Sequence, residues 1–303
     1  MRAVLIGTVE GSRTALRALA AVSGWEVAGV VTLPPANAVR HSDYIDLTPD
    51  IRAAGAEPMH ATDVNAAAVL ERIHAWRPDF VFVIGWSQIC RPAVLATARR
   101  GAIGFHPAPL PRLRGRAPIP WTILLGEKIS ASTLFWIDAG IDTGPILLQR
   151  FFHVAPEETA RTLYDKHVQA IGTLLPEACR LLESDDPPRT VQDEAVATFA
   201  AKRVAEDGAI DWRASAVEIG RLVRAVCPPY PGAFTEERGR RLVILAAEPR
   251  GSDRRWVGLP GQVLLSGDDG FLVRCGEGDL WVSAWRWEDD PAPAPPRLHR
   301  KFG

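Results

Sequence analysis

The sequence predicts an α/β protein in which a Rossmann-like, mostly parallel sheet is followed by a smaller open β-barrel of the OB-like kind. Apolar runs alternate with segments of helical periodicity in the N-terminal part, as in βαβ units. Short alternating runs between glycine and charged turns occupy residues 242–285. Between these parts lies an acidic double-proline segment, 184–189, typical of a linker. The predicted parts are an α/β domain over 1–190, a linker over 191–205 and a C-terminal β-barrel domain over 206–303.

The first elements form a β-α-β unit. Residues 2–7 are an apolar run, leucines at helical spacing follow, and residues 27–33 are again strand-like. Such a unit favours parallel pairing with a right-handed crossover. Gly7 and Gly11 do not complete a GxGxxG pattern, so a dinucleotide site has little support.

The next elements continue the alternation of strands and helices. A helical face precedes residues 80–84, whose uninterrupted apolar character is typical of a buried parallel strand. The further predicted elements are a helix within 65–76, a short helix over 121–125, a strand over 130–137 and a long helix opening at 156–159. The proline-rich tail 291–303 is expected to be poorly ordered.

Composition excludes several classes of protein. Of the 303 residues, 47% are hydrophobic. The formal net charge is −1 and the pI is near 6.7, so the overall charge provides no attraction for a polyanion such as a nucleic acid. The four cysteines are scattered without CxxC spacing, which argues against zinc and disulfides and fits reduced thiols. No apolar run is long enough to cross a membrane. These features predict a cytoplasmic protein that binds neither metal nor membrane.

The stretch 104–121 is the most distinctive part of the chain. It follows strand-like residues and contains His106 among prolines that exclude helix interior and central strand. A stiff polar loop at this place suits a histidine held at the carboxyl edge of a sheet. A surface loop with an incidental histidine is the alternative. The prolines are Pro107, Pro109, Pro111, Pro118 and Pro120.

Two runs of this sequence resemble one family. His106–Gly115 resembles the His-x-Ser-Leu-Leu-Pro-x-x-Arg-Gly signature of the formyltetrahydrofolate-dependent formyltransferases, which include methionyl-tRNA and sugar N-formyltransferases. Asp138–Gly144 resembles their second signature, in the expected order and separation. The resemblance covers nearly the whole chain and is weakest over 34–50 and 250–303. It implies the formyltransferase fold and N10-formyltetrahydrofolate as co-substrate.

Formyl transfer to an amine needs a group that titrates near neutral pH, because the attacking nitrogen must lose a proton. His106 suits this role, and the resemblance places the catalytic carboxylate at Asp142. That carboxylate would orient the imidazole or balance its charge.

The sequence departs from the family at Gly104, where the resemblance leads us to expect the asparagine of an Asn-x-His motif. Glycine offers no amide to stabilise the oxyanion, and losing one such donor costs about 10²–10³ in rate. Three explanations are open: protonated His106 acts alone, Ser87 or Gln88 substitutes, or the chain has lost catalysis.

Further site candidates come from the resemblance and from the strand ends. The loop after residues 80–84 lies against the pterin ring in the family. Alternatives are that Trp86 only packs, that Asp138 only forms a turn, and that Arg114 anchors its loop rather than binding an anionic acceptor. The cofactor-binding candidates are Trp86, Ser87, Gln88, Ile89, Gly104, Asp138 and Gly140. The substrate-binding candidates are Thr8, Pro107 and Arg114.

The prediction of the formyl acceptor depends on the absence of a cluster of basic residues. Family members that formylate initiator tRNA carry a basic loop of the Lys-Pro-x-Arg-Pro-x-Gly-Arg type, whereas residues 34–49 contain only Arg40. We therefore expect a small amine, either a nucleotide-linked amino sugar or an amino acid-type amine. The alternatives are methionyl-tRNA formyltransferase and a folate-binding homologue without catalysis. A homodimer is also considered, although no sequence feature shows one.

Overall fold

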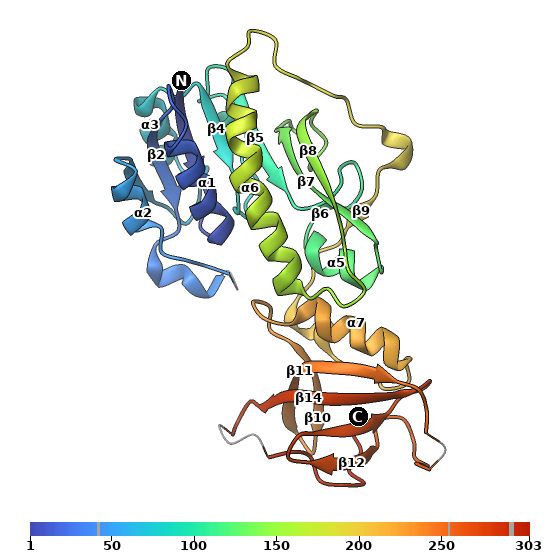
Figure 1. The fold of residues 1–303 in the computed structure, drawn as a ribbon. Coiled ribbons are helices and arrows are strands. Elements are labelled where there is room, and N and C mark those ends of the chain that lie inside the picture. Colours follow the sequence, from blue (N-terminus) through green and yellow to red (C-terminus); the bar gives the residue numbers. More distant parts are fainter. Residues whose placement is uncertain (41–42, 254, 291–293) are drawn as a thin grey trace. The chain divides into compact units, whose positions relative to one another are not determined.

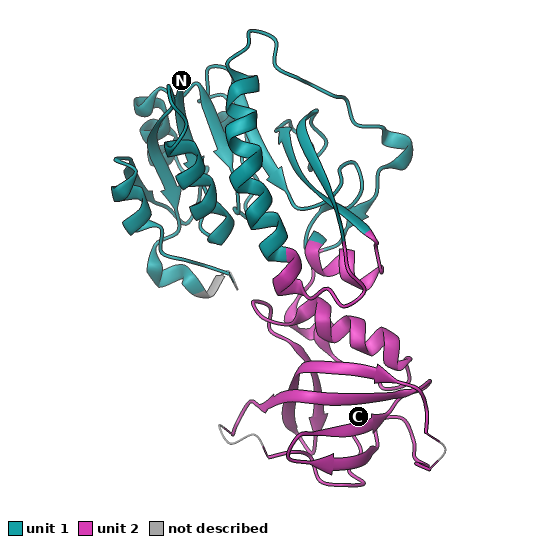
Figure 2. Cartoon of the chain, in the orientation of Figure 1, with its two compact units in different colours: residues 1–118, 129–153, 164–201 teal, residues 119–128, 154–163, 202–303 magenta. Residues whose placement is uncertain are grey.

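The computed structural model describes residues 1–40, 43–253, 255–290 and 294–303. The chain divides into two compact units, shown in Figure 2. Residues 119–128 and 154–163 group with the C-terminal unit, although they lie within the span predicted for the first domain. The first unit comprises 1–118, 129–153 and 164–201, and the second comprises 119–128, 154–163 and 202–303.

The N-terminal unit contains a seven-stranded, mostly parallel sheet, which confirms the predicted fold class (Figure 1). Five neighbouring strands are parallel, and the last two pair antiparallel. In spatial order the strands are β3 (Glu57–His60), β2 (Glu26–Thr32), β1 (Arg2–Ile6), β4 (Phe80–Val83), β5 (Gly101–His106), β7 (Ile129–Trp136) and β8 (Ile146–His153).

Helices cover both faces of the parallel strands. Leu5 of β1 and Phe82 of β4 belong to one buried cluster, whereas the alternate residues Val4 and Val81 belong to another. The first cluster includes side chains of α1 and α6, and the second includes side chains of α3 and α4. Burial on both faces explains why residues 3–6 of β1 and 80–83 of β4 are apolar without interruption. The helices of this part are α1 (Glu10–Ala20), α2 (Thr48–Ala53), α3 (Ala67–Trp76), α4 (Pro92–Leu95), α5 (Pro118–Leu124) and α6 (Ala160–Leu182).

Two predicted elements differ in their bounds. Helix α5 begins at Pro118, whereas the sequence predicted a helix only over 121–125, and Pro118 and Pro120 lie in its first turn. A first turn tolerates proline because its N–H groups have no partner within the helix. The long helix begins at Ala160 rather than at 156, and the Thr159 hydroxyl accepts a hydrogen bond from the Thr162 amide at 3.2 Å.

The strand order places a topological switch point at the carboxyl ends of β1 and β4. The chain adds β2 and β3 on one side of β1, then returns to place β4 on the other side. Ligands of open α/β sheets bind at such a switch point. The two strand ends approach closely, because a Cβ atom at Gly7 would lie 2.2 Å from the carbonyl oxygen of Ile84. The Ser12 hydroxyl donates to that same carbonyl at 2.6 Å.

The C-terminal unit is built on a five-stranded antiparallel sheet, in which four strands correspond to the predicted alternating runs and β10 was not predicted. Within the described residues β10 and β12 remain its two edges, so the barrel is open. The helix α7 (Ala216–Val226) is capped by Ser215, whose hydroxyl accepts from the Glu218 amide. In spatial order the strands are β10 (Ala233–Glu237), β11 (Arg240–Arg250), β14 (Asp279–Trp287), β13 (Gly270–Arg274) and β12 (Val263–Gly267).

Two details of this unit follow from its packing. The pairing of β11 with β14 shifts register near Ala284, so both Val282 and Trp287 are buried despite their odd separation. The tail was expected to be poorly ordered, but Phe302 is buried and stacks on Trp212 with ring centroids 5.5 Å apart. Residues 291–293 of that tail lie outside the described residues.

A buried histidine on α6 has no place in the predicted chemistry. His167 is 2% exposed, and its Nδ1 lies 2.8 Å from the Ser132 hydroxyl. The edge of its ring meets Phe152, with centroids 5.0 Å apart. Burial, and to a smaller degree the charges of His106 and Lys166, lower the pKa of His167 to about 3. The fold therefore holds this ring neutral.

We expect acid to destabilise the protein through His167. Because the folded pKa lies below the unfolded value of about 6.5, the stabilisation is complete above that pH and is lost as the pH falls toward 3. At pH 5 the loss is about 2 kcal/mol. Urea unfolding of His167→Gln at pH 7 and pH 5 should show a pH dependence smaller by this amount. The exposed His74→Gln variant should show the pH dependence of the wild type. If the free energy of unfolding changed with pH equally in all three proteins, His167 would not be the group responsible.

Candidate functional site

The loop after β5 is held in an unusual backbone conformation. Leu113 has φ +59°, a left-handed value that is strained for a residue with a side chain. The short strand β6 (Arg114–Gly115) pairs in parallel with β9 (Phe199–Ala200) and fixes the loop. Thr198 adds two further bonds, since its hydroxyl accepts from the Leu113 amide at 2.9 Å and its carbonyl accepts from the Arg114 amide at 2.9 Å.

His106, the last residue of β5, is buried and its ring orientation is fixed. Its Nε2 lies 2.7 Å from the carbonyl oxygen of Leu113, which can only accept, so Nε2 carries a proton. Its Nδ1 lies 3.5 Å from Oδ2 of Asp142. In the neutral ring Nδ1 therefore holds the lone pair, and a carboxylate lies beside it to stabilise the cation that protonation would create.

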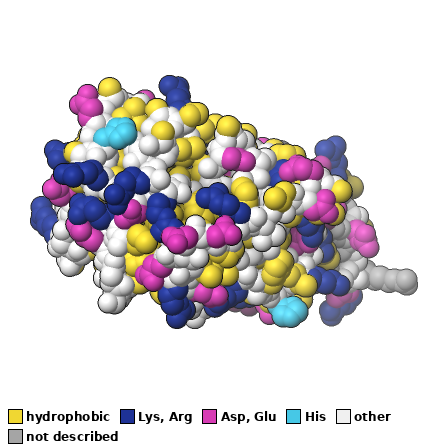
Figure 3. Space-filling model, turned by 90° about the horizontal axis from the view of Figure 1, so that it is seen from above, with side chains coloured by type: hydrophobic (Ala, Val, Ile, Leu, Met, Phe, Trp, Pro, Cys, Tyr) yellow, Lys and Arg dark blue, Asp and Glu magenta, His cyan; other side chains and the backbone are white. Residues whose placement is uncertain are grey.

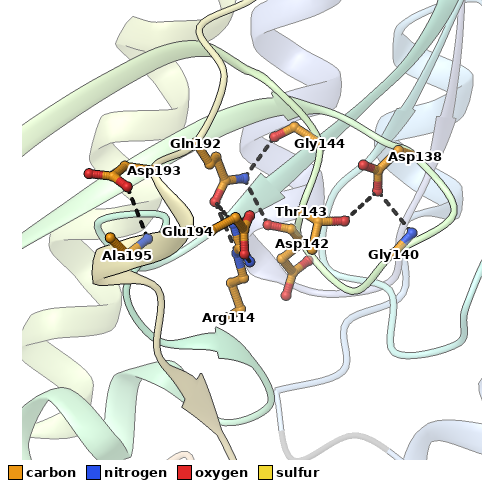
Figure 4. Close-up of polar contacts among 10 residues, drawn as sticks. All are labelled: Arg114, Asp138, Gly140, Asp142, Thr143, Gly144, Gln192, Asp193, Glu194 and Ala195. Carbon is orange, nitrogen blue, oxygen red and sulfur yellow. Dashed lines mark hydrogen bonds and ion pairs between the residues drawn. The ribbon is translucent and has the colours of Figure 1, made fainter.

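Asp142 lies in the loop between β7 and β8 and adopts φ +55°. Its Oδ2 accepts from the Gly115 amide at 2.8 Å, which joins this loop to the loop after β5. Asp138 orders the same turn, because its Oδ1 accepts from the Gly140 amide at 2.9 Å and from the Thr143 hydroxyl at 2.7 Å (Figure 4). The contacts of Asp138 support the turn-forming role.

Arg114 is fully buried, and its guanidinium is used within the fold. It donates to Oε1 of Gln192 through Nε at 3.0 Å and through Nη2 at 2.9 Å. It also makes a two-pronged ion pair with Glu194 at 2.9 and 2.7 Å (Figure 4). The Glu194 carboxylate raises the pKa of Arg114, against the opposing effect of burial. Of the two roles considered for Arg114, these contacts support the loop anchor.

Sequence reasoning missed the three residues that complete this cluster. Gln192, Glu194 and Thr198 lie in or beside the segment assigned to a linker, 191–205, and belong to the N-terminal unit up to residue 201. Gln192 is 78 residues from Arg114 in sequence, so no local pattern marks it. A polar Gln-Asp-Glu run just after the proline break is the one local signal that could have drawn attention.

The other cofactor candidates lie at the neighbouring strand ends. Thr8 follows β1 and is fully buried, and Trp86 follows β4 and packs against the cluster beneath both strands. Their Oγ1 and indole Nε1 atoms are buried without a hydrogen-bond partner among the described residues. Buried polar groups are almost always paired, so this edge fits a ligand that carries hydrogen-bonding groups of its own.

The rest of the loop after β4 is anchored by polar contacts. Gln88 accepts from the Val64 amide at 3.0 Å and donates to the Thr62 carbonyl at 2.5 Å, so both ends of its amide are used. Ile89 exposes 72% of its surface while its carbonyl accepts from Asn65. Ser87 is exposed, and Pro107 is partly exposed at the start of the next loop. Gln88 is therefore occupied as a loop anchor.

Gly104 lies opposite Phe135 in the antiparallel pair of β5 and β7. A Cβ atom at Gly104 would lie 2.7 Å from Cε1 and Cζ of the Phe135 ring and 3.1 Å from Cγ1 of Ile137. Phe135 is 5% exposed. The space in which a larger side chain at position 104 would begin is therefore filled by an aromatic ring.

Two searches of the described residues gave negative results. No helix among them is both long and apolar enough to cross a membrane. Within the same residues, no group of three or more His, Cys, Asp or Glu side chains is arranged to hold a metal ion.

The mostly parallel sheet, its topological switch point and the contact between His106 and Asp142 are the features expected of a formyltransferase-type α/β unit. Family comparison agrees: residues 1–179 match the formyl transferase family, and residues 203–295 match the formyl transferase C-terminal domain. The chain belongs to the formyl transferase family, which uses formyl-tetrahydrofolate, and it is an enzyme of that class.

Curated relatives of similar length support the assignment. The methionyl-tRNA formyltransferase of Geobacter sulfurreducens is 30% identical over 95% of this chain and 90% of its own length. The enzyme of the same name from Moorella thermoacetica is 32% identical over 94% of this chain and 91% of its own length.

Solved structures share the fold at lower identity. HypX from Aquifex aeolicus, in complex with tetrahydrofolic acid, gives a TM-score of 0.68 at 19% identity over 95% of this chain. The present chain spans only 44% of HypX. WlaRD, a sugar 3N-formyl transferase solved with dTDP and 5-N-formyl-THF, gives 0.66 at 16% identity, covering 96% of this chain and 98% of that one.

Proposed function

We propose that this chain transfers a formyl group from N10-formyltetrahydrofolate to the amine of a small acceptor in the cytoplasm. One observation carries this proposal: His106 and Asp142 lie together at the carboxyl edge of the sheet, with Nδ1 and Oδ2 3.5 Å apart. Membership of the formyl transferase family supports the donor. The unpartnered Thr8 and Trp86 groups support a ligand with polar ring atoms at the same edge.

His106 is the proposed base. N10-formyltetrahydrofolate supplies the formyl carbon, which the acceptor amine attacks, and the bond from that carbon to N10 then breaks. Because Nε2 is committed to the Leu113 carbonyl, Nδ1 takes the proton that the amine loses. The Asp142 carboxylate stabilises the resulting imidazolium, and the same proton is available to the departing nitrogen.

The charge of the segment after β2 supports a small acceptor. Residues 34–50 contain one basic residue, Arg40, and three acidic residues, Asp43, Asp46 and Asp50. Asp50 also neutralises Arg17 on α1, at 2.7 Å. Phosphate contacts dominate nucleic-acid affinity, and this segment offers almost none. Basic and acidic side chains both occur over the face shown in Figure 3.

Release of tetrahydrofolate in the presence of different amines tests the proposal. We expect turnover with one class among nucleotide-linked amino sugars, amino acids and hydroxylated ornithine. Release with charged initiator methionyl-tRNA alone would replace the small amine by the second candidate, which the names of the curated relatives favour. Absence of release with every amine, while folate still binds, would reject formyl transfer.

A further inference from the structure

The side chain of Gln192 touches both loops of the candidate active site. Gln192 follows α6 in sequence and is 5% exposed. Its Oε1 accepts the two bonds from Arg114, at 3.0 and 2.9 Å. Its Nε2 donates to the carbonyl of Asp142 at 2.8 Å and to the carbonyl of Gly144 at 2.7 Å (Figure 4).

These four bonds fix the chemistry required at position 192. A guanidinium can only donate and a carbonyl can only accept, so the orientation of the amide follows from its partners. Two acceptor sites and two N–H groups are all that a carboxamide has, and Gln192 uses every one. Glutamate could still bind Arg114 but would have nothing to donate to the two carbonyls.

The two carbonyls are those on either side of Thr143, next to a strained residue. Asp142 has φ +55°, a left-handed conformation that is unfavourable for a residue with a side chain. The donated bonds offset that cost and hold the backbone from which the carboxylate reaches His106 and the Gly115 amide. Arg114, on the other loop, is tied to the same amide.

We propose that Gln192 is a positioning residue of the formyl transfer site, which clamps the Asp142 turn to the His106 loop so that the carboxylate faces Nδ1. The inference rests on the proposed function for its catalytic consequence and on the contacts above for its geometry. Gln192 touches no reacting atom, and it acts through the placement of Asp142.

The test compares Gln192→Glu and Gln192→Met with Val191→Ala. Val191 is the adjacent residue and is 81% exposed, so its variant serves as the matched control. We expect both Gln192 variants to lose about 10² in kcat, the usual cost of a displacement near 1 Å, while the KM for the donor changes little. Val191→Ala should retain wild-type kinetics. Wild-type kcat in Gln192→Glu would overturn the proposal.

A second readout needs no turnover. The Gly115 amide donates to Asp142, so its hydrogen exchange, measured by NMR, reports whether the carboxylate is in place. Exchange should accelerate in both Gln192 variants, while the amides of β1 keep their protection. Unchanged Gly115 protection would overturn the proposal even if kcat fell. If the wild-type protein transferred formyl to no amine, the proposed function would fail, and Gly115 exchange would still decide the placement of Asp142.

Discussion

Replacing His106 with glutamine is expected to lower kcat by about 10²–10⁴-fold, the range that a positioned base contributes. Glutamine is of similar length and can donate to the Leu113 carbonyl, as Nε2 does at 2.7 Å. It has no basic atom to take the place of Nδ1, so the amine keeps its proton. The measurement is the rate of tetrahydrofolate release with the acceptor that the wild type uses.

The variant Asp142→Asn tests whether catalysis needs the negative charge of this side chain or only its hydrogen bond with the Gly115 amide. Asparagine retains an oxygen for the Gly115 amide but removes the negative charge 3.5 Å from Nδ1. Because Asp142 and His106 act as one unit, the double variant should be little slower than His106→Gln alone. Asp185→Asn, an exposed aspartate on the segment after α6, is the control and should keep full activity. Wild-type kcat in both single variants would exclude this pair from catalysis.

Introducing asparagine at Gly104 alone is expected to reduce both stability and activity. The new Cβ would lie 2.7 Å from the Phe135 ring, and overpacking of this kind costs about 1–3 kcal/mol. Gly104→Ala, which adds the same Cβ without an amide, should lose about as much stability. Urea unfolding and kcat are measured for both variants.

Without the Phe135 ring, we expect Gly104→Asn to raise kcat instead of lowering it. In a Phe135→Ala background, Gly104→Asn has room, and an amide beside His106 would donate to the formyl oxygen as its charge grows. We expect kcat of the double variant to exceed that of Phe135→Ala by about 10²-fold, the value of one such donor. A double-mutant cycle gives the coupling directly. A gain from Gly104→Asn alone, or no gain in the double variant, would show that the ring does not control this position.

Local patterns predicted the parts of the structure that depend on local sequence. The uninterrupted apolar residues of β4 mark a strand buried on both faces, and the two signature runs mark the loops of His106 and Asp142. The five strands of the C-terminal unit also followed from alternation and turns, apart from β10.

What could not be predicted depends on contacts distant in sequence. Gln192 lies 50 residues beyond Asp142, and nothing near it in the sequence shows that its amide reaches two loops. The function of Phe135 depends on the register of β5 with β7, which places it opposite Gly104. Arg114 is a related case: a loop-anchoring role was among the roles considered for it, but its partners Gln192 and Glu194 lie 78 and 80 residues away and could not be named from the sequence.

The pairing of β6 with β9 has consequences for folding of the nascent chain and for the design of chimaeric enzymes. The Leu113 amide is bonded to the Thr198 hydroxyl across 85 residues, so a nascent chain that ends after α6 has its histidine but lacks the residues that shape the loop around it. We therefore expect the loop around His106 to take its final form only after residues 198–200 have been synthesised. A chimaera that exchanges C-terminal parts between relatives should have its junction after Ala201. An earlier junction would combine the loop after β5 from one parent with Gln192 or β9 from the other.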